Sequence, residues 1–214
     1  MFKRIKNYYK QLKDSRNDNL DVSHFNDAVA EATEWMPLNT ASANFNNFKL
    51  VSESPVLLRY RVTLGAKVFA TIFMLAGAIF LIAFLVSKSK FSLEDLFPIA
   101  ICVVFIGVGA GMAYSLSSPK VFDKQYQRYM SGHERKKRIV PFSDIHALQL
   151  IRFNIYASDG PDYSNYQLNL VLASGKRINI CYYNSLDIAR KDMLKISNFM
   201  DKKCWDATLN SEYI

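Results

Sequence analysis

The sequence has few of the residues that form metal sites or covalent cross-links. Its 214 residues include only three cysteines and three histidines. The cysteines, Cys102, Cys181 and Cys204, show no CxxC spacing and have no pair of histidines nearby. We therefore interpret all three as free, packed thiols of a reducing compartment, and not as metal ligands or disulfide bridges.

Motifs of common catalytic and nucleotide-binding sites are also missing. No GxxxxGK(S/T), GxGxxG, HExxH or GxSxG occurs in the chain. His24, His133 and His146 lie far apart without metal-ligand spacing, and Asp159 and Asp162 belong to a loop that is generally polar. The sequence therefore predicts a protein that is not an enzyme and that has no cofactor and no metal.

Two stretches lack charge altogether, although the chain as a whole carries a net charge of +8. Residues 68–86 and residues 97–116 contain no Asp, Glu, Lys or Arg. About 20 apolar residues in a helix cover the ~30 Å hydrocarbon core of a bilayer. The first run also lies too far from the N-terminus to be a cleaved signal peptide. The sequence predicts a hairpin of two transmembrane helices within residues 65–118.

Basic residues flank the outer ends of this hairpin. Residues 59–67 contain two arginines and a lysine before the first span, and residues 120–128 contain two lysines and an arginine after the second. The connector, residues 87–96, has two basic and two acidic residues and no basic excess. The positive-inside rule then predicts a multi-pass inner-membrane protein with both termini in the cytoplasm.

Small residues within the spans are candidates for close helix packing. Gly107 and Gly111 form a small-xxx-small pair in the second span, and Gly77 lies between two alanines in the first. Small residues let helix backbones approach where lipid supplies no hydrophobic drive. The pattern fits packing within the hairpin and also fits an interface between copies in a homo-oligomer. Neither span has an ionisable side chain between its ends, which disfavours transport by a single copy.

The part before the spans contains helical and then strand-like patterns. Residues 1–17 predict a basic amphipathic helix. Ser23 is a candidate cap for a second helix that ends before Pro37. Residues 44–50 and 56–62 alternate apolar and polar positions and predict a β-hairpin. We expect this hairpin to pack on the C-terminal sheet, so that the spans are an insertion within one cytoplasmic domain.

The part after the spans is predicted to be mostly β-structure with one final helix. The pattern places strands at residues 120–130, 135–141, 145–155, 166–173 and 177–183. An amphipathic helix begins at Asn184 or Ser185, and Trp205 is a candidate anchor for its end. The fold class is therefore a membrane α-helical hairpin plus an α+β cytoplasmic domain.

A small strand-rich domain that ends in one amphipathic helix resembles the pleckstrin-homology (PH) fold. The resemblance covers residues 119–205 and rests on residues 121–132, 139–145, 166–172 and 174–177. Residues 35–38 are similar to the lead-in of a group of bacterial two-span proteins. The resemblance implies a small β-barrel or sheet closed by the C-terminal helix. The predicted parts are 1–43 (amphipathic helices), 44–64 (β-hairpin), 65–118 (spans), 119–205 (PH-like domain) and 206–214 (tail).

The most concentrated charge is a run of four cations, Arg135, Lys136, Lys137 and Arg138. In membrane-binding PH domains the corresponding hairpin contacts lipid phosphates, so the resemblance implies a site for anionic lipid or a protein partner. A juxtamembrane positive-inside signal or a solvated edge strand also explains the run. Nucleic acid is disfavoured, because basic and aromatic residues do not alternate along one groove.

Two functional hypotheses follow from these patterns. The first is a non-enzymatic inner-membrane binding protein, such as an immunity or regulatory protein, whose PH-like module holds a protein or lipid. The second is a toxin-like effector of bacterial anti-phage defence that oligomerises through its two spans and disrupts the inner membrane. The partners expected are the lipid bilayer, a protein and, in the second case, further copies of the chain.

Overall fold

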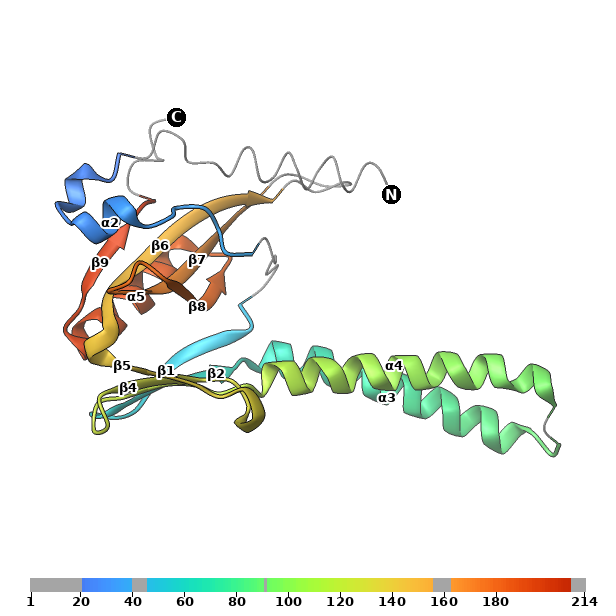
Figure 1. Cartoon of the computed structure of the whole chain (residues 1–214). Helices are drawn as coiled ribbons and strands as arrows, with labels where there is room; N and C mark the ends of the chain where they lie inside the picture. Colours follow the sequence, from blue (N-terminus) through green and yellow to red (C-terminus); the bar gives the residue numbers. More distant parts are fainter. Residues whose placement is uncertain (1–20, 40–45, 91, 156–162, 209–214) are drawn as a thin grey trace.

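Two β-sheets form a domain from which a pair of long helices projects to one side (Figure 1). The structure is a computed structural model, and it describes residues 21–39, 46–90, 92–155 and 163–208. The predicted helix at residues 1–17 lies outside the described residues. The long apolar helices, the two sheets and the C-terminal helix confirm the predicted α+β architecture.

Sheet A contains strands from both sides of the helical hairpin. Its five strands are antiparallel neighbours in the order β1-β2-β3-β4-β5. The strand before the helices, β2, pairs with the strand after them, β3, in the register Leu57↔Asp123 to Arg59↔Val121. The helices are therefore an insertion between two adjacent strands of one sheet. The bounds are β1 Phe48–Ser54, β2 Leu57–Val62, β3 Lys120–Asp123, β4 Arg128–Ser131 and β5 Arg138–Pro141.

The strand predicted at residues 120–130 was wrong, because the chain turns in its middle. β3 and β4 are joined by a tight turn in which Gln127 has a φ of 48°. The Asp123 carboxylate accepts a hydrogen bond from the Tyr126 N–H, and the Gln127 carbonyl accepts one from Phe142. These contacts hold a left-handed residue where the sequence has no glycine.

Sheet B follows the sequence prediction more closely. Its strand order is β8-β7-β6-β9, with β6 Ile145–Ile155, β7 Tyr163–Leu172, β8 Arg177–Tyr183 and β9 Lys203–Asp206. The predicted C-terminal helix is present as α5 (Leu186–Met200); it begins one residue later than predicted, with Ser185 at its N-cap. The sequence analysis missed β9, which runs parallel to β6. Trp205 lies within β9 and is buried in the contact with the N-terminal segment described below.

The main core lies between sheet A, the inner face of sheet B and α5. The helix contributes a buried stripe of Ala189, Met193, Ile196 and Met200. Sheet A contributes Leu58, Tyr60, Phe122 and Tyr129 among others. Burying each large apolar side chain contributes roughly 1.5–3 kcal/mol, so this cluster is the principal stabilising contact of the domain. The sheet B members are Ile145, Leu148, Leu150, Leu168, Leu170, Ile178, Ile180, Cys181 and Tyr183.

The N-terminal segment covers the outer face of sheet B, away from sheet A (Figure 1). The long helix predicted from Ser23 was wrong: a 3₁₀ turn η1 (Ser23–Phe25) precedes a short helix α2 (Ala28–Ala32). Asp27 caps α2, because its carboxylate accepts a hydrogen bond from the Val29 N–H at 3.0 Å. Residues 33–39 then cross the sheet without regular structure.

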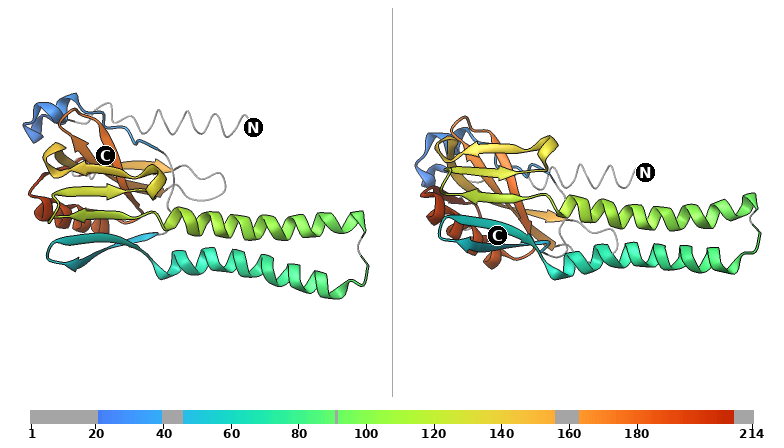
Figure 2. Two further views of the ribbon diagram at one scale, coloured as in Figure 1. Left: turned by 60° about the horizontal axis from the view of Figure 1, so that its bottom comes forward. Right: turned by 90° about the horizontal axis from the view of Figure 1, so that it is seen from below.

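The helical hairpin is joined to sheet A by short connections (Figure 2). Helix α3 (Leu64–Ser87) begins one residue after β2 ends. That residue, Thr63, caps α3 by accepting a hydrogen bond from the Ala66 N–H. A 3₁₀ turn η2 (Leu93–Asp95) leads into α4 (Leu96–Leu116) at the far tip, and three residues then connect α4 to β3.

Candidate membrane interface

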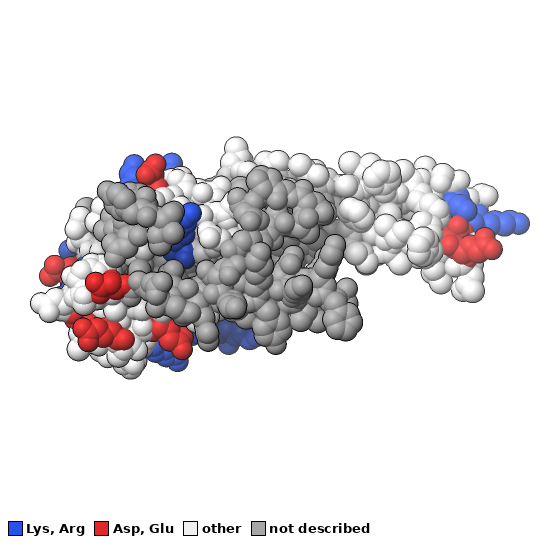
Figure 3. Space-filling view, turned by 90° about the horizontal axis from the view of Figure 1, so that it is seen from above, with Lys and Arg blue, Asp and Glu red and all other residues white. Residues whose placement is uncertain are grey.

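Both long helices have the length and composition needed to cross a membrane. The apolar helical stretches Leu64–Ser87 and Leu93–Leu116 each contain 24 residues. At 1.5 Å per residue each spans about 36 Å, against ~30 Å for the hydrocarbon core. Only 11% of the most apolar window of each is buried, whereas a helix in a soluble core would be mostly covered. On the face shown in Figure 3, charged residues lie on the domain and at the far tip, with none between them.

The two helices pack through a different set of glycines from the predicted one. A Cβ added to Gly77 would lie 2.8 Å from the Cys102 carbonyl oxygen, so Gly77 does take part in the contact. Its counterpart on α4 is Gly109, where an added Cβ would lie 2.8 Å from the Ala70 carbonyl oxygen. Gly107 and Gly111, predicted as helix-packing residues, have no heavy atom within 4 Å of such a Cβ. They face away from α3, so packing within the hairpin does not explain them.

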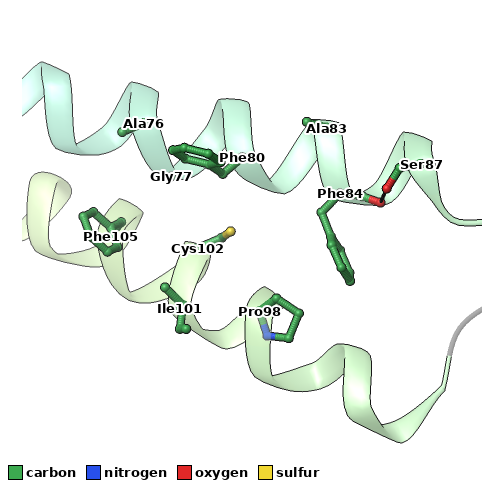
Figure 4. A pocket seen from close by; sticks show the side chains of 10 residues that line it. All are labelled: Ala76, Gly77, Phe80, Ala83, Phe84, Ser87, Pro98, Ile101, Cys102 and Phe105. Atoms are coloured by element: carbon green, nitrogen blue, oxygen red, sulfur yellow. Dashed lines mark hydrogen bonds between the residues drawn. The ribbon is translucent and has the colours of Figure 1, made fainter.

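Toward the tip, the helices border an open apolar pocket of about 570 Å³ (Figure 4). Ser87 is its one hydroxyl-bearing lining residue, and no charged side chain lines it. Beyond it, an ion pair of 2.7 Å between Lys88 Nζ and Asp95 Oδ1 ties the ends of the helices. The pocket can accommodate hydrocarbon. Its lining is Ala76, Gly77, Phe80, Ala83, Phe84, Ser87, Pro98, Ile101, Cys102 and Phe105.

The β4–β5 connection is fixed to the base of α4. His133 Nε2 lies 3.0 Å from the Tyr114 carbonyl oxygen, and the two rings stack with centroids 4.2 Å apart. Gly132 donates its N–H to the Pro119 carbonyl. Gly132 has a φ of 91°, which a residue with a side chain rarely adopts. The chain therefore turns back at the point where α4 enters the domain, as Figure 2 shows.

The predicted basic run lies on this connection. Arg135 and Lys136 belong to the 3₁₀ turn η3 (Glu134–Lys136), Lys137 follows it, and Arg138 opens β5. The strand predicted from Arg135 was therefore wrong in its start, because the turn occupies those residues. All four side chains are exposed, and in the described part of the chain none forms an ion pair. Four uncompensated cations thus lie beside the base of the hairpin.

The other basic residues after the second span are not arranged with this run. Lys120 is turned into the domain, where its Nζ donates to the Ile180 carbonyl at 2.6 Å and lies over the Phe48 ring. Burial lowers the pKa of Lys120. Lys124 and Arg128 sit at the opposite end of β3 and β4, where they contact aromatic rings. The sequence alone did not separate these cations from the exposed ones.

The cysteines and histidines considered above as possible chemical groups make structural contacts. Among the described residues, no three His, Cys, Asp or Glu side chains lie close enough to hold a metal ion. The three cysteines are free thiols, and burial raises the pKa of Cys181 to about 11. His24 contacts the Asp21 carbonyl, and His146 contacts the Asp27 carboxylate.

One buried network of hydrogen-bonded side chains was not predicted from the sequence. The Tyr60 and Tyr183 hydroxyl oxygens are 2.5 Å apart, and the Tyr183 hydroxyl donates to Asp192 at 3.0 Å. Burial raises the pKa of the Asp192 carboxyl and of both tyrosines. Tyr60, Tyr183 and Asp192 are respectively 4%, 0% and 8% exposed, which leaves no access for a substrate. These two hydrogen bonds between side chains link β2, β8 and α5 inside the core.

Comparison with known proteins gives no family to which the chain can be assigned. No family model, no curated protein and no solved structure matches it. By its architecture the chain is an α+β protein, with two sheets and an inserted hairpin of two long apolar helices. The function has to be inferred from the residues themselves.

Proposed function

We propose that the chain is a non-enzymatic protein of the bacterial inner membrane whose cytoplasmic domain binds anionic lipid headgroups through Arg135, Lys136, Lys137 and Arg138. One observation carries the proposal: the segment with these four unpaired cations is held against the end of α4 by His133. If α3 and α4 span the bilayer, this segment lies at the headgroups of the adjacent leaflet. A solvated patch would not need to be fixed there.

The orientation within the proposal comes from charge. The exposed cations lie at the domain end of the hairpin, while the tip has Lys88 and Lys90 balanced by Glu94 and Asp95. The positive-inside rule then puts the domain and both termini in the cytoplasm. Tyr114, near the domain end of α4, has the amphipathic ring typical of a membrane interface.

The domain itself fits a binding role. We include the PH-like likeness in the proposal, and the packing of two sheets with α5 supports it. Each basic residue near an anionic surface contributes about 1 kcal/mol, and salt weakens this attraction. Such a contact would orient the domain on the membrane, where it would present its remaining surface to a protein partner, as an immunity or regulatory protein does.

The lipid contact can be tested by lipid-dependent stabilisation. The full chain in neutral detergent micelles is titrated with phosphatidylglycerol, and its Tm is measured. A ligand that binds only the folded state raises the Tm as its concentration rises. We expect a rise for the wild type at low salt, and loss of most of that rise in the variant Arg135→Glu, Lys136→Glu, Lys137→Glu, Arg138→Glu.

Since the loss could come from charge reversal alone, the control reverses two exposed lysines away from the hairpin base, Lys176→Glu and Lys191→Glu, and is compared with the double variant Arg135→Glu, Lys136→Glu as well as with the fourfold variant. We expect the control to keep the wild-type response. If the fourfold variant responds to phosphatidylglycerol as fully as the control does, the cations do not bind lipid and the proposal is wrong.

A homo-oligomer that disrupts the membrane is the second candidate function. Gly107 and Gly111 support it, because they form a small-residue face on α4 that α3 leaves uncovered. Expression of the chain in a bacterial host, with a membrane-potential dye, would then cause depolarisation. Gly107→Leu with Gly111→Leu should abolish it, whereas Ile72→Phe with Ile79→Phe adds bulk at exposed positions of α3, away from these glycines, and should not. Polarised, growing wild-type cells would remove the support for this candidate.

A further inference from the structure

The outer face of sheet B is lined by buried amide side chains. Gln149, Asn165, Gln167 and Asn169 are each 0% exposed, and they alternate along β6 and β7 with the leucines of the main core. A buried polar group costs free energy unless it is hydrogen-bonded, and an apolar cover would have avoided that cost. This face therefore combines buried amides, which can bind polar atoms, with an apolar patch of Ala147, Val171 and Trp205 that packs against the N-terminal segment.

The polar atoms that it binds belong to the backbone of residues 34–38. Gln149 Nε2 donates to the Glu34 carbonyl at 3.0 Å, and Arg177 Nη1 donates to the Met36 carbonyl at 2.6 Å. The Leu38 N–H donates to Gln167 Oε1 at 2.9 Å. The contacts fall on every second residue, and each joins a side chain of the sheet to the main chain of the segment. Such contacts would accept any sequence that follows the same path.

Side chains of the segment supply two further anchors. Glu34 Oε2 lies 3.0 Å from Arg177 Nη2, although the Glu34 side chain is 82% exposed. Trp35 stacks on Phe25 at 5.3 Å and lies against Trp205 at 6.0 Å. An acidic residue followed by an aromatic one is thus the chemistry that the surface selects.

The face offers more hydrogen bonds than the segment uses. Asn165 is fully buried, and neither its amide nitrogen nor its amide oxygen has a partner. Buried amides in native proteins are nearly always paired, so an unpaired one requires an explanation. Asn165 precedes Gln167 by two residues and lies on the same face of β7. A longer or differently placed polypeptide would satisfy it.

We propose that the outer face of sheet B is a docking surface for a segment of a partner protein that has an acidic-aromatic pair, and that residues 33–38 occupy it within the same chain until the partner displaces them. The proposal concerns another surface than the lipid contact and is independent of it. An attached segment acts at an effective concentration in the millimolar range, so a partner binds well only when the chain's own segment is weakened or outcompeted.

The test uses the full chain in detergent micelles and a fluorescein-labelled synthetic peptide of residues 21–39. Trp35→Ala weakens the chain's own segment and leaves the sheet intact. We expect the peptide, followed by fluorescence anisotropy, to bind the Trp35→Ala chain at least ten-fold more tightly than the wild type. Adding Arg177→Ala to that chain should abolish binding, whereas adding Leu194→Ala, at an exposed position of α5, should not.

A second measurement does not depend on the folding of Trp35→Ala. Hydrogen exchange of the wild type, followed by mass spectrometry, should show amides of residues 28–38 exchanging at least 100-fold faster than those of β6. If the Trp35→Ala chain does not fold, Glu34→Lys replaces it, because that side chain is largely exposed.

Two results would overturn the proposal. Exchange in residues 28–38 as slow as in β6, with equal peptide binding by both chains, would make the segment a fixed part of the fold. A wild-type dimer that Arg177→Ala converts to monomer would assign the surface to exchange between two copies, and not to a separate partner.

Discussion

The two faces of sheet B are built by the same strands, yet different forces hold their covers in place. Along β6 and β7, the leucines at positions 148, 150, 168 and 170 enter the apolar core beneath α5, while Gln149 and Gln167 on the other face bind the main chain of residues 34–38. Apolar burial depends on volume and fit, whereas hydrogen bonds to a backbone are exchanged readily with water or another chain. We infer that the inner face determines stability and the outer face permits exchange.

The largest effect should come from the inner face. Leu150 is 0% exposed, and Leu150→Ala leaves a cavity that should lower the free energy of unfolding by about 2–5 kcal/mol. Urea unfolding of the full chain in micelles, followed by tryptophan fluorescence, measures this loss. Leu194→Ala, at a position 53% exposed, is the control and should change stability by less than about 0.5 kcal/mol. Equal effects would contradict the assignment of the core.

A smaller and more local effect is expected on the outer face. Gln149 donates to the Glu34 carbonyl and accepts from Asn169 Nδ2, so Gln149→Ala leaves two buried groups unpaired. We expect a cost of about 1–3 kcal/mol. Hydrogen exchange should show it as faster exchange in residues 28–38 with little change in β7. If Gln149→Ala lowered the free energy of global unfolding as much as Leu150→Ala does, the two faces of sheet B would contribute to stability in the same way.

The smallest effect concerns pH. Burial raises the pKa of Asp27, but hydrogen bonds from Lys203 and His146 outweigh it and lower the pKa from 3.8 to about 2. Because the folded-state pKa is depressed, the contribution of Asp27 is complete above pH 4 and is lost as the pH falls toward 2. The stability difference between wild type and Asp27→Asn should therefore shrink as the pH falls from 4 to 2. A difference that stays constant would show that the ion pairs do not stabilise α2.

The sequence predicted those elements whose signal lies in a continuous stretch. Runs of 19 and 20 uncharged residues define α3 and α4, and the alternation of β6, β7 and β8 agrees with the strands found. The β3–β4 turn was missed because Gln127 adopts the left-handed region without a glycine to indicate it. β9 was missed because four residues give almost no periodicity, and its partner β6 lies about 50 residues earlier in the chain.

The candidate sites depend on how helices and strands are oriented and packed, which the sequence does not show. Gly107, Gly109 and Gly111 have the same spacing pattern, and only the rotation of α4 decides that Gly109 meets α3. Gln167 and Asn169 alternate with leucines, which predicts a solvated outer face, because nothing in β7 indicates that a segment about 130 residues earlier covers it. The basic run was visible, whereas its attachment to α4 through His133 was not.

Only Thr63 separates β2 from α3, so a movement of the helical hairpin is transmitted directly to sheet A. Thr63 both ends the strand region and caps the helix, so there is no hinge in which a tilt of α3 can be absorbed. A helix of 24 residues is about 36 Å long, while the β2–β3 ladder has three residue pairs, at Leu57 to Arg59 of β2. If α3 and α4 cross a bilayer, thinning of that bilayer would therefore act as a shear on the β2–β3 ladder.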